Sequence, residues 1–163
     1  MKNTIVKIGG WALLCCSIAA NAAIVEFQVA LDGSQLGTTG DPDGYGNATL
    51  SIDDQALTAS WNFSVYNIAL PLTAAHIHVG AAGTNGTVVV DFSGQLTGAN
   101  LNDADLANVL LNPSNYYINL HNSEHSSGAI RGQLGSPVPV PAALPLLLSG
   151  LGMFAWTRKR RMQ

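Results

Sequence analysis

Apolar and polar residues alternate along much of the chain between residues 23 and 134, and this alternation limits the folds that the chain can adopt. Side chains of a β-strand point to the same face at every second residue, so an alternating run buries one face and exposes the other. Glycine, asparagine and aspartate clusters separate the runs, as turns do between short strands. In one run, the residues that share the predicted buried face are Leu57, Ala59, Trp61, Phe63 and Val65. The runs predict strands at residues 24–31, 48–52, 57–65, 74–79, 87–92, 116–121 and 129–134.

One segment of this region has helical spacing instead. Leu106, Val109 and Leu110 recur at the spacing of one helix face, and Pro113 ends the segment. Asn102 or Asp103 can cap its first turn. Short strands with turns between them, and a single short helix, predict an all-β fold in about 110 residues, an antiparallel β-sandwich.

Residues 1–22 have the features of a secretion signal. Lys2 and Lys7 place positive charge before an apolar stretch, residues 8–20, and the chain then reads Ala-Asn-Ala, a small-x-small cleavage pattern. We expect signal peptidase to cleave before Ala23. An uncleaved N-terminal anchor is the alternative, although the apolar stretch is short for a membrane span.

The predicted domain, residues 23–135, is strongly acidic. It contains all ten acidic residues of the chain and only one of the seven basic residues, Arg131, so its net charge is −9. The negative electrostatic field of such a domain repels the phosphate backbone of nucleic acids, which argues against nucleic acid as a partner. The same field favours cations as ligands. Cys15 and Cys16 lie in the predicted signal, so the exported domain has no disulfide and depends on its hydrophobic core.

The composition changes at residue 136, where a proline-rich segment leads into an apolar run and then a basic end. The apolar run, residues 142–156, is slightly short for a bilayer, which about 20 apolar residues cross. With its flanking residues it predicts a transmembrane helix at about residues 139–157. Positive residues after a span stay cytoplasmic, so the exported domain lies on the opposite side. These basic residues are Arg158, Lys159, Arg160 and Arg161. The tail as a whole covers residues 136–163.

This order of prolines, apolar span and basic cluster resembles the PEP-CTERM sorting signal family over residues 138–161. The resemblance implies processing by an exosortase, a membrane transpeptidase-like enzyme of Gram-negative bacteria that make exopolysaccharide. A glutamate of the family's core is missing, which leaves the exosortase subtype open. A plain single-span anchor that is never cut is the alternative. The residues that stand in place of the Pro-Glu-Pro core are Val138, Pro139, Val140, Pro141 and Ala142.

Two further segments, residues 74–92 and 116–134, carry the remaining motifs. The first contains Ala-His-Ile-His and a Gly-x-x-Gly turn, and the second contains Asn-x-His and Gly-x-Ile-Arg-Gly. Together they resemble the CHRD domain family, named after chordin, over residues 24–134. The resemblance implies an immunoglobulin-like or superoxide-dismutase-like β-sandwich of secreted and cell-surface proteins, with no settled biochemical activity. Asn122 stands where the family often has threonine.

All four histidines of the chain lie in these two segments. His76 and His78 share one face of a predicted strand, and His121 lies on the corresponding face of its own strand. Three converging imidazoles can hold zinc or copper, and the following loop offers Glu124 or His125 as a fourth ligand. The alternative is that these histidines only form hydrogen bonds with neighbouring loops.

The other polar features of the domain have structural explanations. We expect Arg131 to pair with Asp91 or Glu124 and to hold strands together. Residues 41–47 have the alternating aspartates of a calcium loop but lack its later bidentate acid, so an ordinary turn is the alternative. No nucleophile with a base, phosphate-binding glycine loop or pair of carboxylates predicts a catalytic site.

Two functions therefore stay open. The first is a non-enzymatic envelope or extracellular-matrix protein, in which the tail displays a CHRD-like module that contacts exopolysaccharide or surface proteins. The second is a periplasmic or extracellular domain that binds zinc or copper through its histidines. In both cases we expect the chain to be anchored first in the inner membrane, with its domain in the periplasm. Processing of the tail would then release the domain to the outer surface or the matrix.

Overall fold

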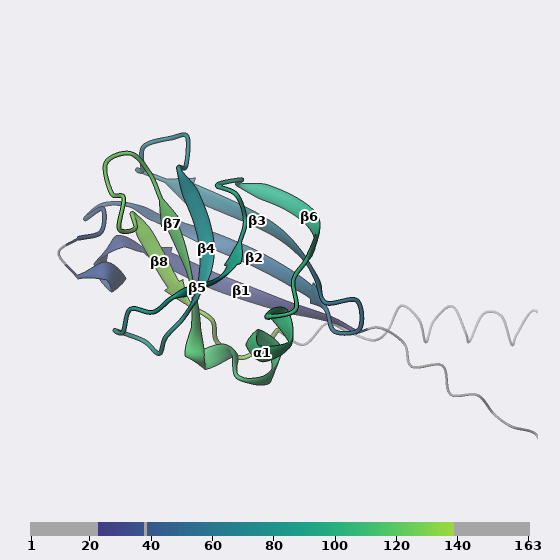
Figure 1. The fold of residues 1–163 in the computed structure, drawn as a ribbon. Coiled ribbons are helices and arrows are strands. Elements are labelled where there is room, and N and C mark those ends of the chain that lie inside the picture. The colour runs from purple at the N-terminus through teal and green to yellow at the C-terminus, as the bar shows by residue number, and fades with distance from the viewer. Residues whose placement is uncertain (1–22, 38, 139–163) are drawn as a thin grey trace, which may run out of the picture.

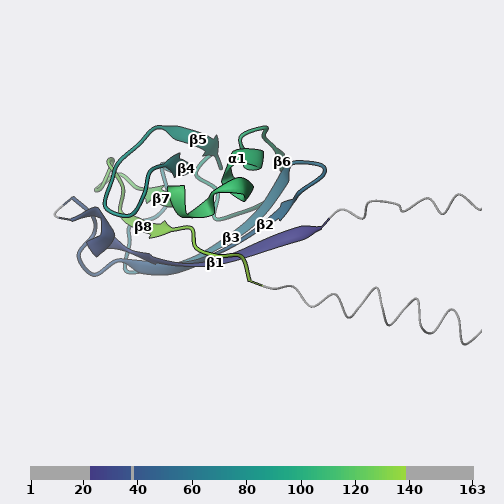
Figure 2. The same ribbon diagram turned by 90° about the horizontal axis from the view of Figure 1, so that it is seen from below.

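Antiparallel strands form one continuous sheet in this computed structural model, which describes residues 23–37 and 39–138. The order of strands across the sheet is β5-β4-β7-β8-β1-β2-β3-β6. The sheet curls so that β1, β2 and β3 form one layer, and β4, β5 and β7 lie over them as a second layer (Figures 1 and 2). The strands are β1 (Ile24–Asp32), β2 (Tyr45–Asp53), β3 (Thr58–Tyr66), β4 (Ala74–Val79), β5 (Val88–Asp91), β6 (Thr97–Asn102), β7 (Tyr116–His121) and β8 (Ile130–Gln133).

The two layers are joined through β8 and β1, whose register pairs Arg131 with Asp32. β1, β2 and β3 are longer than β4, β5, β7 and β8, and each runs for nine residues. The antiparallel all-β fold predicted from residue alternation is confirmed. The layers belong to a single curled sheet, because β8 pairs with β7 of one layer and with β1 of the other.

The alternating residues pack as predicted between the layers. Ala59 and Phe63 of β3 are buried, and Trp61 between them is partly buried against the same core. The ring of Phe92, which follows β5, lies 4.7 Å from that of Trp61 and 5.4 Å from that of Phe63 between ring centroids. Aromatic packing of this kind adds to the free energy gained by burying apolar surface.

The single predicted α-helix is present as α1 (Leu106–Leu111), with short 3₁₀ turns η1 (Gly33–Leu36) and η2 (Pro113–Asn115) elsewhere. Leu106 and Val109 are buried, as the helical spacing predicts. The Asp103 carboxylate accepts a hydrogen bond of 2.9 Å from the backbone N–H of Asp105 at the start of the helix. The N-cap of α1 is Asp105, which makes no side-chain capping bond, so neither predicted residue caps the helix, and Asp103 stabilises the turn that precedes it.

The prediction missed one strand, β6. Its sequence, Thr-Gly-Ala-Asn-Leu-Asn, has little apolar alternation, and none of its six residues is buried. It pairs with β3 through an irregular register between Ala59 and Trp61. Gly98 lies flat against the Trp61 ring, where an added Cβ would come within 2.2 Å of ring carbons. Strand pairing and this close aromatic contact define β6, and neither leaves a periodic signal in the sequence.

The first and last described residues lie at the same end of β1. The N–H of Val138 donates a hydrogen bond of 2.8 Å to the carbonyl of Glu26, and the N–H of Ala23 donates one of 2.9 Å to the Asp54 carboxylate. The predicted signal and nearly all of the predicted sorting tail lie outside the described residues. Within the described residues, no helix has the length and apolar character needed to cross a membrane.

Candidate metal centre

The three predicted ligand histidines lie on the outer face of β4 and β7. The register of the two strands pairs His78 with Tyr117, His76 with Asn119, and Ala74 with His121. The alternate residues of these strands are fully buried in the core, which turns the histidines to the opposite face. Those core residues are Ala75, Ile77, Ile118 and Leu120.

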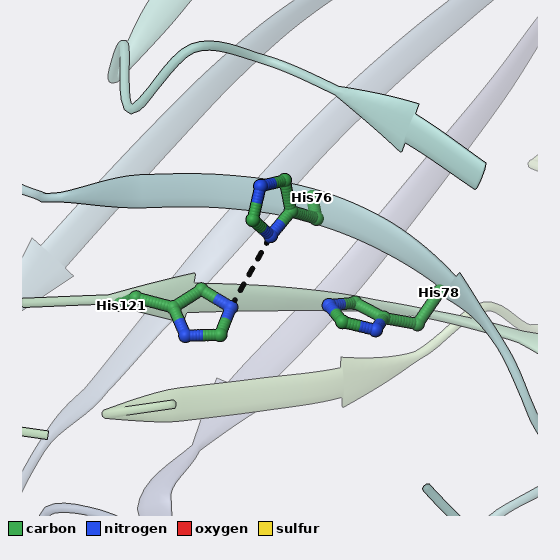
Figure 3. A group of neighbouring side chains, drawn as sticks. All are labelled: His76, His78 and His121. Atoms are coloured by element: carbon green, nitrogen blue, oxygen red, sulfur yellow. Dashed lines mark hydrogen bonds between the residues drawn. The ribbon is translucent and has the colours of Figure 1, made fainter. Parts of the chain in front are cut away.

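The imidazole nitrogens converge (Figure 3). The Nδ1 atom of His76 lies 3.3 Å from the Nε2 atom of His121, and one ligand nitrogen from each of the three rings lies within 4.8 Å of the others. Two nitrogens bound to one tetrahedral ion at about 2.0–2.1 Å are separated by roughly 3.3–3.4 Å. His76 and His121 are therefore already spaced for one ion, and a small movement of the His78 ring would complete the set.

Backbone carbonyls orient two of the rings. The Nδ1 atom of His78 is 3.0 Å from the carbonyl oxygen of Gly86, and that of His121 is 2.9 Å from the carbonyl oxygen of Ser126. A carbonyl oxygen only accepts hydrogen bonds, so Nδ1 carries the proton in both rings and Nε2 keeps a lone pair. Metal-binding histidines are oriented in this way by a hydrogen bond at the other ring nitrogen.

His76 is oriented by a carboxylate. Its Nε2 atom lies 3.6 Å from an Asp91 carboxylate oxygen, and the β4–β5 register places the two residues opposite each other. This negative charge favours the tautomer with the proton on Nε2, which leaves the Nδ1 lone pair directed at His121. His78 and His121 thus have hydrogen-bond acceptors for their protonated nitrogens, and His76 has the Asp91 charge beside its Nε2. Each ring can then present its other nitrogen to the centre of the group.

The ligand nitrogen of His78 has no partner among the described residues. His78 Nε2 is buried and makes no hydrogen bond there. An unsatisfied buried polar atom destabilises a protein by about 1–3 kcal/mol, and native structures contain few of them. A cation at the centre of the group would satisfy this lone pair.

Burial keeps two of the rings neutral. The pKa of His76 is lowered by loss of hydration and then by the neighbouring His121, and the Asp91 charge opposes this shift. The pKa of His78 is also lowered mainly by burial, with further lowering by His121 and Arg131, whereas its hydrogen bond to Gly86 raises it. Neutral imidazole is the form that binds a metal ion.

The predicted fourth ligands do not join the group. His125 turns away, with Nε2 3.7 Å from the Asp41 carboxylate and Nδ1 3.1 Å from the carbonyl oxygen of Thr39. Glu124 is likewise outside the converging set. Asn122 explains the direction of this loop, because its side-chain oxygen accepts hydrogen bonds from the backbone N–H groups of Glu124 and His125.

The region considered as a calcium loop forms a turn before β2. The Asp41 side chain is largely buried and contacts His125, and the carbonyl of Asp41 accepts a hydrogen bond from the N–H of Gly44. These contacts agree with the alternative that the Asp-Pro-Asp-Gly sequence is an ordinary turn.

The prediction for Arg131 is wrong in its partners. Among the described residues Arg131 makes no ion pair with Asp91 or Glu124. Its guanidinium donates instead to the side-chain oxygen of Asn85 and the carbonyl of Ala81, at 3.2 Å each. Arg131 still has a structural role, because these bonds connect β8 to the turn between β4 and β5.

The sequence matches a family model described as the CHRD domain over residues 27–134. The match covers all of the β-fold except the first residues of β1 and includes every histidine of the site, in agreement with the resemblance found in the two motif segments. No curated protein and no solved structure is similar enough to give a match.

The lowered pKa values predict a stability change with pH in metal-free protein. Below the ordinary histidine pKa of about 6.5, the unfolded chain takes up protons at His76 and His78 before the folded chain does. The free energy of unfolding should therefore fall as the pH decreases through about 6.5 toward the lower folded-state values. Urea unfolding of the full-length protein with a chelator, at several pH values between about 5 and 8, measures this dependence.

The control is the His76→Gln, His78→Gln double variant, in which both titrating groups are replaced by neutral amides. This variant should lose most of the pH dependence above about pH 5, since most carboxylates titrate at lower pH. An equal pH dependence in both proteins would show that the two histidines titrate alike in the folded and unfolded chains.

Proposed function

We propose, for a chain that belongs to the CHRD domain family, that its domain is an exported module that binds one copper or zinc ion through His76, His78 and His121. The observation that carries this proposal is the convergence of three ring nitrogens, each oriented by a contact at the opposite nitrogen of its ring. Imidazole suits both copper and zinc, and an exported domain meets these ions outside the cytoplasm.

The alternative, in which the histidines only form hydrogen bonds with neighbouring loops, explains the site less well. Bonds to Gly86 and Ser126 satisfy one nitrogen of His78 and one of His121. They leave His78 Nε2 buried without a partner. With the His76 proton on Nε2, they also leave the lone pairs of His76 Nδ1 and His121 Nε2 facing each other at 3.3 Å. A bound cation accounts for all three inward-facing lone pairs.

The charge of the domain supports a cationic ligand. Residues 23–135 have a net charge of −9, so the surrounding field attracts metal ions. The protein ligands themselves are neutral, and three of them leave a coordination position for water or another small ligand. His76 and Asp91 are partly or largely exposed, which makes their edge of the site accessible to solvent. The proposal concerns metal binding and assigns no catalytic residue.

Metal content tests this function directly. Full-length protein purified in detergent, loaded with zinc or copper and freed of excess ion, should contain about one ion per chain. The His78→Ala, His121→Ala double variant should contain almost none, because it removes two of three ligands. Elemental analysis and titration with a competing chelator measure content and affinity.

His125→Ala is the matched control, since it removes a histidine of the neighbouring loop whose ring points to Asp41. It should bind metal like the unaltered protein. Metal at background level in the unaltered protein, or equal binding in the double variant, would contradict the proposed site.

We also propose that the domain is exported by its signal and tethered to the membrane by its tail until an exosortase processes it. The bridge between Val138 and Glu26 supports a tether at a defined point, because it fixes the start of the tail beside β1. The domain would then be displayed toward the cell exterior, where exopolysaccharide and other surface proteins are the available partners. The order of prolines, apolar run and basic residues in the sequence is the basis of this part of the proposal.

Removal of residues 139–163 tests the tether. The full-length chain should sediment with membranes, whereas the shortened chain should appear in the soluble periplasmic fraction after signal cleavage before Ala23. Cell fractionation and mass spectrometry of the N-terminus measure both events. An equal distribution of the two chains would exclude the tail as the anchor.

A further inference from the structure

We propose that Arg131 is a positioning residue for this site, which fixes the ligand nitrogen of His78 by holding the turn and the ring that contact it. The proposal rests on the proposed metal-binding function, but it makes a separate claim about the metal-free protein. Arg131 comes from β8 and is not among the converging ligand residues, so its effect must be carried by other groups.

The first connection runs through the turn between β4 and β5. The carbonyl of Gly86 in this turn fixes the proton of His78 on Nδ1. Arg131 contacts the same turn at two points, through Ala81 at its start and through Asn85 next to Gly86. The planar guanidinium holds both contacts at once, which constrains where the Gly86 carbonyl can lie.

The second connection is a stack of three side chains. The central guanidinium carbon of Arg131 lies 3.3 Å from the centre of the Tyr117 ring. Tyr117 in turn stacks on His78, with ring centroids 5.0 Å apart and planes only 9° from parallel. The Tyr117 hydroxyl also accepts a hydrogen bond of 3.2 Å from the N–H of Gly86. Tyr117 therefore contacts both the His78 ring and the residue that orients it.

Burial makes a merely space-filling role for Arg131 a poor explanation. Its side chain is only 2% exposed, it has no carboxylate partner among the described residues, and burial lowers its pKa. Burying such a cation is unfavourable, and an apolar side chain of similar size avoids the loss of hydration. The guanidinium provides what an apolar side chain cannot, namely donors to the turn and a cationic face for the Tyr117 ring.

A second residue of β8 holds the other end of the same turn. The side-chain amide of Gln133 donates a hydrogen bond of 3.0 Å to the carbonyl of Gly80. β8 thus fixes the turn at Gly80, Ala81 and Asn85, and the His78 ring is held between the turn and Tyr117. Arg131 is the member of β8 that contacts both the turn and the ring.

The test compares Arg131→Met and Arg131→Lys with the unaltered full-length protein. In metal-free protein, nitrogen NMR of the imidazoles should show His78 protonated on Nδ1, and Arg131→Met should give a mixture of the two tautomers. Zinc affinity of Arg131→Met should fall by about 10–100-fold, as for other residues that orient metal ligands. Arg131→Lys should lie between the two, because an ammonium cannot match the planar fork.

Leu50→Ala is the matched control for lost stability. Leu50 is a fully buried residue of β2, in the other layer of the sheet, so this variant should be less stable but keep the His78 tautomer and the zinc affinity. If Arg131→Met does not fold, Asn85→Ala replaces it, since Asn85 is exposed and contributes one of the two contacts to Arg131.

The outcomes separate the two proposals. Absence of zinc binding in the unaltered protein would overturn the proposed function, whereas the tautomer measurement would still test the role of Arg131. An unchanged His78 tautomer and unchanged zinc affinity in a folded Arg131→Met protein would overturn the positioning role and leave the metal site intact.

Discussion

Backbone hydrogen bonds between β4 and β7 determine which side chains of the two strands share a face, and the candidate site depends on this register. With His78 opposite Tyr117 and His76 opposite Asn119, the end of β7 brings His121 beside the two histidines of β4. A shift by one residue would exchange core and outer faces, because strand side chains alternate. The same apolar residues that anchor these strands in the core therefore fix the imidazoles on the other side.

The second requirement of the site is a partner for each outward ring nitrogen. Gly86, Ser126 and Asp91 provide these partners, and each belongs to a loop or an adjacent strand. The histidines are thus oriented before any ion arrives, which reduces the rearrangement that binding requires. Arg131 supports these partners from behind the histidines, since it contacts both the turn that carries Gly86 and the Tyr117 ring.

Much of the fold could be predicted from the sequence, because alternation in β3 and helical spacing in α1 reflect burial directly. The shared face of His76 and His78 follows from the same two-residue repeat. The partners of Arg131 could not be predicted, because they are oxygens of a turn that approaches β8 only in the folded chain. The direction of His125 was missed for a similar reason, as Asn122 and Asp41 set it through contacts across loops.

The most direct test of the metal site is a crystal structure of the full-length protein grown with zinc, with anomalous scattering used to locate the ion. Three histidine ligands predict one peak bound by His76 Nδ1, His78 Nε2 and His121 Nε2, at about 2.0–2.1 Å from each. The hydrogen bonds of His78 to Gly86 and of His121 to Ser126 should remain in place. A zinc ion bound elsewhere, or the three rings unchanged and empty at saturating zinc, would contradict the account.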